Sequence, residues 1–332
     1  MMLLVLTLVA SLAYGCGGQA APAPASGAPT AAPAPASSGK AAKQFYTMGS
    51  GGPGGVWFTM VGGLTTYLSS KLDGVVISPD VTGGSVENVN RTASGEQDMA
   101  FYHSTHLYQS RNNEGVWKDK APVTNIQGVG AVYESHFTLV TLAKTGIKSL
   151  KDLEGKRVNL GAAGSGTVDS TKSVLEVLGI NAQTSTLAFD ESCTALKDGR
   201  LDAIAQAGAP STGIVELAAV EDIVVLPFSD DELNKILAKF PYWSKSMLPA
   251  GVYEDVKAPV PTWSLKVYWG ANEKTPADLI YNSLKAVVSE DGKKFLSTVH
   301  PLWKEFGAGT EGFKALGMKE HPGAEKFWQE KK

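Results

Sequence analysis

Residues 44–60 read QFYTMGSGGPGGVWFTM, and this stretch predicts a short strand, a glycine turn and a helix in immediate succession. Inside it, Gly49, Gly51 and Gly54 satisfy G-x-G-x-x-G, the spacing of a dinucleotide-binding turn. Asp80 closes the next apolar run, where an acid that binds a ribose is expected. A nucleotide site is therefore one hypothesis for this turn, to be weighed against the rest of the chain.

The chain repeats this arrangement further on. Residues 46–55 (YTMGSGGPGG) align without gaps with residues 158–167 (VNLGAAGSGT). Residues 94–104 (SGEQDMAFYHS) and 198–208 (DGRLDAIAQAG) share G-x-x-D followed by an apolar strand. Each is preceded by a segment of helical length that begins with capping residues. The paired order favours two lobes of like topology over a chance similarity of Gly-rich turns.

The rest of the body alternates apolar runs of strand length with helical patterns, which indicates an α/β fold with largely parallel sheets. A late helix that starts near Pro276 can return to pack on the first lobe and make it discontinuous. We place lobe I at residues 44–132 and 265–332, and lobe II at residues 133–264.

The N-terminal residues predict export. MMLLVLTLVASLAYGCGG is apolar but short for a membrane span, which indicates a signal peptide over residues 1–16. LAYGC is similar to a lipoprotein cleavage box, in which Cys16 would become the acylated first residue. Residues 17–43 are almost entirely Ala, Pro, Gly and Ser and predict a disordered tether. We expect the protein outside the cytoplasm, in the periplasm or lipid-anchored at the outer face of the cell membrane.

Composition excludes several classes of function. A net charge of -3 without a long basic run argues against nucleic acid as a partner. Cys16 and Cys193 are the only cysteines, so neither disulfides nor a Cys-based metal site is expected, and Cys193 is expected in the core. The chain lacks the P-loop and nucleophile-elbow patterns. His103 and His106 lie three residues apart, but the strand predicted there would separate them. No catalytic residue, metal site or cofactor is therefore predicted.

The glycine turns suit a small anion. Ligands of an open parallel α/β sheet bind beyond the carboxyl ends of the strands, where helices begin. A turn of Gly and Ser at a helix start presents unpaired N–H groups and the positive end of the helix dipole. The turn at residues 161–167 adds the hydroxyls of Ser165 and Thr167, whereas the first turn leads into the aromatic Trp57. Any one such turn can also be a tight connection and no more.

An ordered set of motifs over residues 45–329 resembles the TAXI-type solute receptors, the extracytoplasmic binding subunits of TRAP (tripartite ATP-independent periplasmic) transporters. The motifs are GSGGPGGVWF, TGGSVENV, GEQDMAFYHS, SLKDLEGKRVNLGAAGSGT, DGRLDAIAQAGAP, FPYWSKSMLPAGVY and HPGAEKFW. The resemblance implies a type II periplasmic-binding-protein fold, in which two α/β lobes close on a ligand in the cleft between them. Ligands of the family tend to be glutamate, glutamine or related small carboxylates.

The resemblance also implies the residues that contact the ligand. Carried over position by position, they are Gly51, Gly52, Gly55, Trp57, Ser85, Asn88, His103, Ser165, Gly166, Thr167, Gly208 and Pro210. The chain has VWF at residues 56–58 where the family usually has TYY, and HST at residues 103–105 where it commonly has QSD. The second change removes an acid that would face a ligand ammonium. We therefore expect a small carboxylate or similar anion that lacks an amino group or carries a larger apolar part.

The expected function is that of an extracytoplasmic receptor, not an enzyme, which delivers a small organic anion (glutamate-like or another carboxylate) to a TRAP-type permease. We expect a monomer without a cofactor, in contact with the membrane only through its N-terminal anchor. Two alternatives stay open. The same fold can serve an ABC importer or a sensor system, and the G-x-G-x-x-G turn can belong to an exported NAD-dependent oxidoreductase.

Overall fold

The computed structural model describes residues 42–307 and 309–331. The predicted signal peptide, Cys16 and nearly all of the tether lie outside these residues. The strands are β1 (Gln44–Gly49), β2 (Val75–Asp80), β3 (Met99–His103), β4 (Ile126–Leu142), β5 (Arg157–Asn159), β6 (Gln183–Ser185), β7 (Ala203–Ala207), β8 (Ile223–Val225), β9 (Ser244–Leu248) and β10 (Val260–Asn272). The α-helices are α1 (Val56–Lys71), α2 (Ser85–Ser94), α3 (Ser104–Asn112), α4 (Gly166–Leu178), α5 (Phe189–Lys197), α6 (Thr212–Ala218), α7 (Asp230–Lys239), α8 (Ala277–Val288), α9 (Glu290–Val299) and α10 (Pro322–Lys331). Short 3₁₀ helices are η1 (Gly115–Trp117), η2 (Ala143–Thr145), η3 (Leu150–Leu153) and η4 (Pro301–Glu305).

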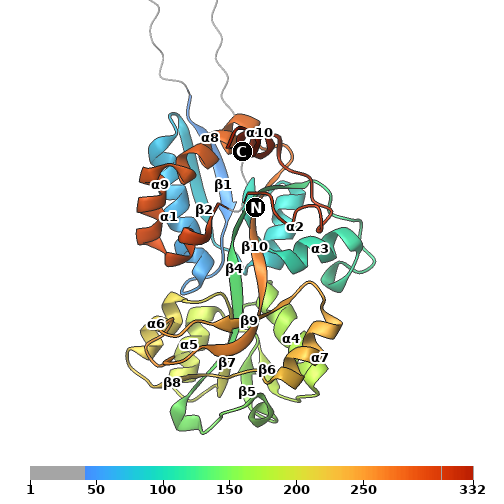
Figure 1. Ribbon diagram of the computed structural model, residues 1–332, viewed down its shortest axis with the longest axis vertical. Coiled ribbons are helices and arrows are strands. Elements are labelled where there is room, and N and C mark those ends of the chain that lie inside the picture. The colour runs from blue at the N-terminus through green and yellow to red at the C-terminus, as the bar shows by residue number, and fades with distance from the viewer. Residues whose placement is uncertain (1–41, 308, 332) are drawn as a thin grey trace, which may run out of the picture. The chain divides into compact units, whose positions relative to one another are not determined.

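These elements form two α/β lobes that share two long strands (Figure 1). The sheet order is β2-β1-β3-β10-β4-β7-β5-β6, with β8 beside β4 and β9 beside β10. Strands β1, β2 and β3 are parallel in one lobe, and β5, β6 and β7 are parallel in the other. β4 pairs with antiparallel β10 in its first part and with β7 in its last part. The predicted two-lobed α/β fold is confirmed.

The prediction of largely parallel sheets needs a correction at β4 and β10. The chain crosses from the first lobe to the second in β4 and returns in β10, so the two strands must run in opposite directions. The lobe boundaries predicted at residues 132/133 and 264/265 fall within these two strands. Because both strands are continuous through the sheet, those boundaries stay a prediction.

The internal repeat is present, but the ungapped sequence alignment is displaced by two residues. Asp98 accepts a hydrogen bond from the backbone N–H of Thr47 at 2.7 Å, and Asp202 accepts one from the backbone N–H of Arg157 at 2.8 Å. Met48 pairs with Met99, as Val158 does with Ala203. The structure therefore matches Thr47 with Arg157, whereas the alignment of glycines matches it with Asn159. Each G-x-x-D acid therefore bonds to the equivalent strand of its lobe, Asp98 to β1 and Asp202 to β5.

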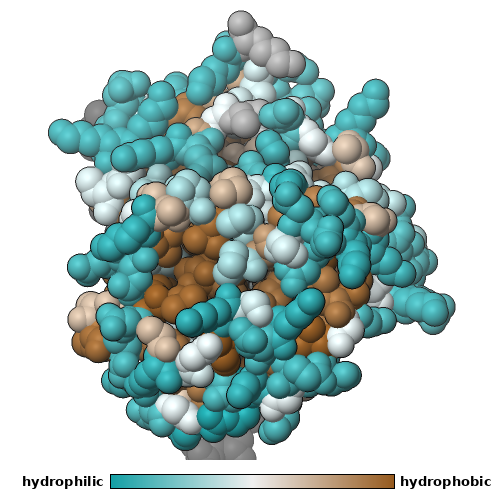
Figure 2. Space-filling view, turned by 60° about the horizontal axis from the view of Figure 1, so that its bottom comes forward, coloured by the Kyte–Doolittle hydropathy of each residue, from teal (hydrophilic) through white to brown (hydrophobic). Residues whose placement is uncertain are grey.

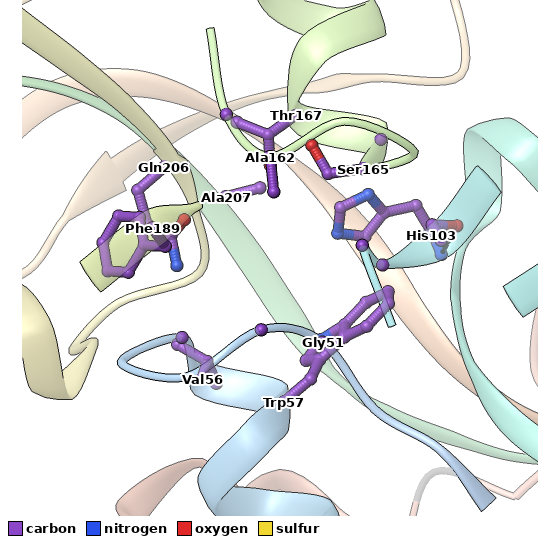
Figure 3. A pocket seen from close by; sticks show the side chains of 17 residues that line it. Gly51, Val56, Trp57, His103, Ala162, Ser165, Thr167, Phe189, Gln206 and Ala207 are labelled. Atoms are coloured by element: carbon purple, nitrogen blue, oxygen red, sulfur yellow. Dashed lines mark hydrogen bonds between the residues drawn. The ribbon is translucent and has the colours of Figure 1, made fainter. Parts of the chain in front are cut away.

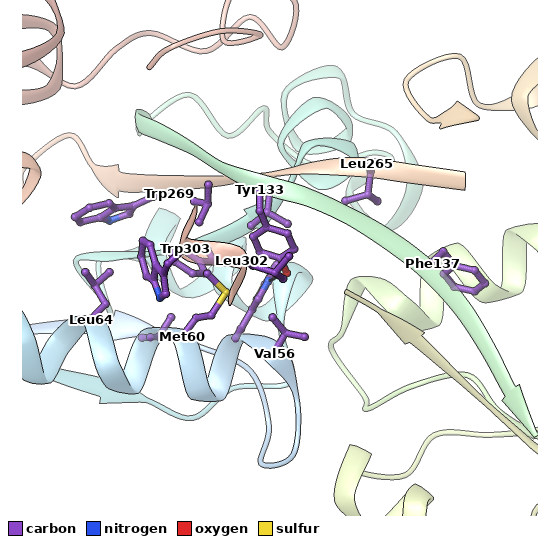
Figure 4. Packing of buried hydrophobic residues seen from close by; sticks show 14 of the residues in the cluster. Val56, Met60, Leu64, Tyr133, Phe137, Leu265, Trp269, Leu302 and Trp303 are labelled. Carbon is purple, nitrogen blue, oxygen red and sulfur yellow. Dashed lines mark hydrogen bonds between the residues drawn. The ribbon is translucent and has the colours of Figure 1, made fainter. Parts of the chain in front are cut away.

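Helix α1 anchors the core of the first lobe. Met60 and Leu64 are fully buried on its inner face, against Trp269 of β10 and Trp303 of η4 (Figure 4). Helices α8 and α9 return after β10 and pack on α1, as predicted for the late helix. This packing fixes the N-terminus of α1, and with it the turn at residues 50–55.

Two adjacent glycines of α1 should respond to alanine in opposite ways. A Cβ at Gly62 meets nothing within 4 Å, whereas a Cβ at Gly63 would lie 2.4 Å from Cγ1 of Val299. We expect Gly62→Ala to raise the free energy of unfolding by about 0.5–1 kcal/mol, because alanine loses less backbone entropy in a helix. Gly63→Ala should lower it by about 1–3 kcal/mol, because the branched valine cannot move aside freely. Urea unfolding of both variants measures the two values, and equal values would contradict the described α1–α9 contact.

The molecular surface is hydrophilic with apolar hollows on the face that Figure 2 shows. Phe45, Phe58, Val81 and Val220 are among the exposed large apolar side chains. Within residues 42–307 and 309–331, no helix combines the length and the hydropathy that a membrane span requires.

Candidate functional site

A cavity of about 60 Å³ lies where strands and helix N-termini of both lobes meet (Figure 3). Its walls include the first residues of α1, α2, α4 and α5, and the last residues of β3 and β7. The lining residues are Gly51, Gly52, Gly55, Val56, Trp57, Gly83, Gly84, Ser85, His103, Gly161, Ala162, Ser165, Gly166, Thr167, Phe189, Gln206 and Ala207. The repeat explains this convergence, because each lobe contributes two strand–turn–helix units with the same orientation.

Most of the residues predicted to contact a ligand lie on the cavity wall. They are Gly51, Gly52, Gly55, Trp57, Ser85, His103, Ser165, Gly166 and Thr167. Their role as ligand contacts stays a prediction. Asn88, Gly208 and Pro210 do not line the cavity, although all three were predicted to contact the ligand.

The structure gives these three residues other positions. The Asn88 amide is fully buried and donates to the carbonyls of Ser50 and Phe101, so it fixes the turn behind the cavity. Gly208 lies behind the wall with φ of +95°, a conformation that glycine adopts readily. The carbonyl of Pro210 lies 2.9 Å from Nε2 of His300 and faces that side chain. The spacing of the motifs predicted that these residues lie near the site. It did not distinguish residues that line the cavity from residues that support its wall.

Other lining residues were not predicted. Phe189 begins α5, and Gln206 and Ala207 end β7. The internal repeat could have identified Ala207, because it corresponds to His103 at the end of the equivalent strand. Gly83 and Gly84 belong to the turn before α2, where only Ser85 was selected.

Helix α4 begins as a well-formed N-terminus at the cavity. Ser165 is its N-cap, and the Ser165 hydroxyl accepts from the N–H of Val168 at 3.3 Å. The N–H groups of Gly166 and Thr167 belong to the first turn and have no intrahelical acceptor. No Asp, Glu, Lys or Arg is present among the described lining residues. The helix N-termini therefore supply a positive potential without a cationic side chain.

His103 brings an uncharged imidazole to the wall. Its side chain is buried, and burial, reinforced by neighbouring His106, holds the pKa of His103 well below the ordinary value for histidine. Its Nδ1 atom has no hydrogen-bond partner among the described residues. Figure 3 shows the ring directed into the cavity beside Trp57 and Ser165. A neutral ring with a free nitrogen can donate to a ligand or accept from it, depending on its tautomer.

The prediction that His103 and His106 are kept apart is wrong. The strand ends at His103, and α3 begins at the next residue, so the two rings come within 5.7 Å between centroids. Nδ1 of His106 lies 3.0 Å from the Ser85 hydroxyl, and its Nε2 lies 3.6 Å from a carboxylate oxygen of Asp169. His106 thus contacts Ser85 of α2 and lies close to Asp169 of α4 in the second lobe.

Several backbone contacts hold the lobes close together around the cavity. The N–H of Glu87 donates to the carbonyl of Gly164 at 3.1 Å, and the N–H of Gly213 donates to the carbonyl of Gly54 at 3.0 Å. Gly83 lies so near the second lobe that a Cβ on it would be 2.0 Å from the carbonyl oxygen of Ala163. In this arrangement the cavity has room for only about four to six water-sized positions, given roughly 10–15 Å³ for each.

This size bears on the dinucleotide hypothesis. With room for about four to six water-sized positions, the cavity holds far fewer atoms than a dinucleotide has. The carbonyl of Gly54, the third glycine of the fingerprint, accepts from the second lobe. The geometry therefore favours a small ligand over a dinucleotide at this turn.

Two further sequence predictions concern Cys193 and metals. Cys193 is buried on α5, and burial raises the pKa of its thiol to about 12, which confirms it as a core residue. In the part of the chain that the structure describes, no group of three or more His, Cys, Asp or Glu side chains is placed to hold a metal ion.

The fold is similar to that of several solved proteins. MatC from Rhodopseudomonas palustris, solved with bound malate, is 14% identical over 86% of this chain and 96% of MatC, with a TM-score of 0.53. The periplasmic binding protein BugD is 13% identical over 83% of this chain and 98% of BugD, with a TM-score of 0.51. A putative L-cystine ABC transporter protein from Listeria monocytogenes is 17% identical, with 80% and 98% covered and a TM-score of 0.48. The likeness to MatC and BugD confirms the predicted periplasmic-binding-protein fold.

A family match covers most of the sequence. Residues 48–331 match the NMT1-like family, and this range is well over half of the 332 residues. The chain belongs to the NMT1-like family.

Proposed function

We propose that this protein is an extracytoplasmic solute-binding protein that captures a small organic anion between its lobes and delivers it to a membrane permease. The observation that carries the proposal is the convergence of the N-termini of α1, α2, α4 and α5 on one cavity lined by uncharged side chains. Their N–H groups and dipoles favour a carboxylate or a similar anion. MatC, which shares the fold, holds malate.

The ligand we propose lacks an ammonium group. A carboxylate stabilises a buried ammonium most strongly, and the wall offers no acid among its described residues. Trp57 and Phe189 add apolar and aromatic area instead. The proposed contacts are the lining residues already predicted, joined by Phe189 and Gln206.

The permease type is a separate part of the proposal. The family description and the names of the three similar structures mention no TRAP transporter, so the TAXI and TRAP assignment is not confirmed. One of the three is titled an ABC transporter, which supports the alternative reading better. We therefore put an ABC importer first and a TRAP permease second. An ATPase gene or a fused permease gene beside this one would distinguish the two.

Export and lipid anchoring complete the proposal. The predicted signal peptide and the predicted cleavage box at Cys16 support a mature protein tethered at the outer face of the cell membrane. The family and the fold favour a binding protein over the NAD-dependent oxidoreductase that the glycine fingerprint suggested.

A thermal-shift panel tests the anion-binding proposal. Native mass spectrometry of the purified protein first identifies any ligand that it carries. Lactate, pyruvate, succinate, malate and small sulfonates are then titrated while the melting temperature is recorded. A ligand that binds only the folded form should stabilise it by about 2.7 kcal/mol at a hundredfold excess over Kd, with the stabilisation growing as the logarithm of concentration. Sodium chloride at equal ionic strength is the control, and an unchanged melting temperature with every anion would count against the proposal.

A further inference from the structure

Tyr133 makes a buried contact behind the cavity wall. The indole N–H of Trp57 donates to the Tyr133 hydroxyl at 2.9 Å, and the two side chains are 7% and 4% exposed. Burial raises the pKa of Tyr133 well above its ordinary value, so the hydroxyl stays protonated at neutral pH. Trp57 opens α1 of the first lobe. Tyr133, which Figure 4 labels, belongs to β4, and Figure 1 shows this strand running from one lobe to the other.

The backbone at Tyr133 is irregular in a way that directs its side chain. Val267 of β10 pairs with Tyr133, and the next residue, Tyr268, pairs with Ala131. Val132 is thus an extra residue in β4, and such bulges bend a strand and re-aim the side chains beside it. The bulge lies where β4 leaves the first lobe, so the position of the Tyr133 hydroxyl depends on the position of this strand.

Trp57 connects Tyr133 with the cavity. Its indole lies edge-on to the His103 ring, with 4.8 Å between centroids and 65° between planes, and near Phe101 at 6.1 Å and 86°. Both Trp57 and His103 line the cavity, and Nδ1 of His103 lacks a partner among the described residues. The indole therefore packs directly against the ring that carries the free nitrogen.

Gly208 leaves the space that this arrangement needs. A Cβ at Gly208 would lie 3.1 Å from the Tyr133 hydroxyl and 3.2 Å from Cγ2 of Val56. Gly208 was expected to contact the ligand, and the structure instead places it against the residue that supports Trp57.

We propose that Tyr133 is a positioning residue of the cavity: its hydroxyl fixes the Trp57 indole, which fixes the His103 ring against the ligand. The inference rests on the proposed function, because it assigns a role within that site. It also couples the site to β4, since a shift of this strand between the lobes moves the acceptor of the Trp57 N–H.

The test combines a double-mutant cycle with a spectroscopic signal. Tyr133→Phe removes only the hydroxyl, and Trp57→Phe removes the donor; the double variant closes the cycle. The matched control is Tyr268→Phe on β10, a tyrosine equally buried whose hydroxyl donates to the carbonyl of Glu311 away from the cavity. The first readout is the indole N–H resonance of Trp57 in ligand-free protein, assigned by its absence in Trp57→Phe.

We expect Tyr133→Phe to shift this resonance upfield and to weaken binding of the best acid among lactate, pyruvate, succinate and malate about 3- to 10-fold. In the Trp57→Phe background the same change should alter Kd less than about twofold, because the partner is already gone. Tyr268→Phe should leave both readouts near wild type. An unchanged resonance, or an equal loss of affinity in both backgrounds, would overturn the inference. If none of the acids binds the wild type, the proposed function fails, while the resonance still tests the positioning contact.

Discussion

Gly83→Ala is expected to weaken ligand binding roughly 10- to 100-fold while leaving the ligand-free fold intact. The added Cβ would lie 2.0 Å from the carbonyl oxygen of Ala163, an atom of the opposite lobe. Overpacking of this kind costs about 1–3 kcal/mol, which accounts for the loss of affinity. The backbone of Gly83 is outside the left-handed region, so alanine fits once the lobes separate. A contact of 3.2 Å with the end of the flexible Glu87 side chain remains in the open arrangement, so most of the cost falls on the closed one.

Calorimetry with the best carboxylate and small-angle scattering of the ligand-free variant measure this effect. The radius of gyration should rise with Gly83→Ala, and the N–H of Glu87, which donates across the lobes to Gly164, should lose protection from hydrogen exchange. Gly62→Ala, which meets nothing within 4 Å, is the control for a glycine change outside the interface. Wild-type affinity in Gly83→Ala would show that closure of these turns is not needed for binding.

Gly166→Ala should have the larger effect, a loss of affinity of about 100-fold or more. Its Cβ would lie 2.1 Å from Cε1 of His106 and 2.8 Å from Nδ1 of His103. Alanine is otherwise well tolerated in the first turn of a helix, so α4 itself should form normally. The substitution blocks both the approach of the lobes and the free nitrogen of His103.

A second substitution checks that the cause is steric. Removing the obstructing ring in the Gly166→Ala, His106→Ala double variant should restore part of the affinity relative to Gly166→Ala alone. Circular dichroism melting confirms that each variant is folded, and calorimetry supplies the dissociation constants. No recovery in the double variant would mean that Gly166 acts by another route, such as the loss of a backbone contact to the ligand.

The sequence predicted the turns of the site well because their chemistry is local. Ser165 was expected in a turn at a helix start, and the structure places the N-cap of α4 at this residue. The G-x-x-D acids Asp98 and Asp202 were found as a repeat, and they make the same strand contact in each lobe.

What the sequence could not predict depends on contacts between distant segments. Alignment by glycines paired Gly49 with Gly161, yet the equivalent of Gly49 in the sheet is Asn159. Neither glycine nor proline marks the boundary at His103, where the strand turns directly into a helix and brings His106 to the site. Tyr133 belongs to no motif, and only the packing of β4 against α1 connects it with the cavity.

The most direct test of the central claim is a calorimetric comparison of matched acids with and without an ammonium group. The pairs are lactate with alanine, malate with aspartate, and glutarate with glutamate. Because helix N-termini offer donors for the carboxylate and the wall lacks an acid for the ammonium, the tightest ligand of the panel should be an acid without an amino group. Glutamate as the tightest ligand of the panel would contradict the account.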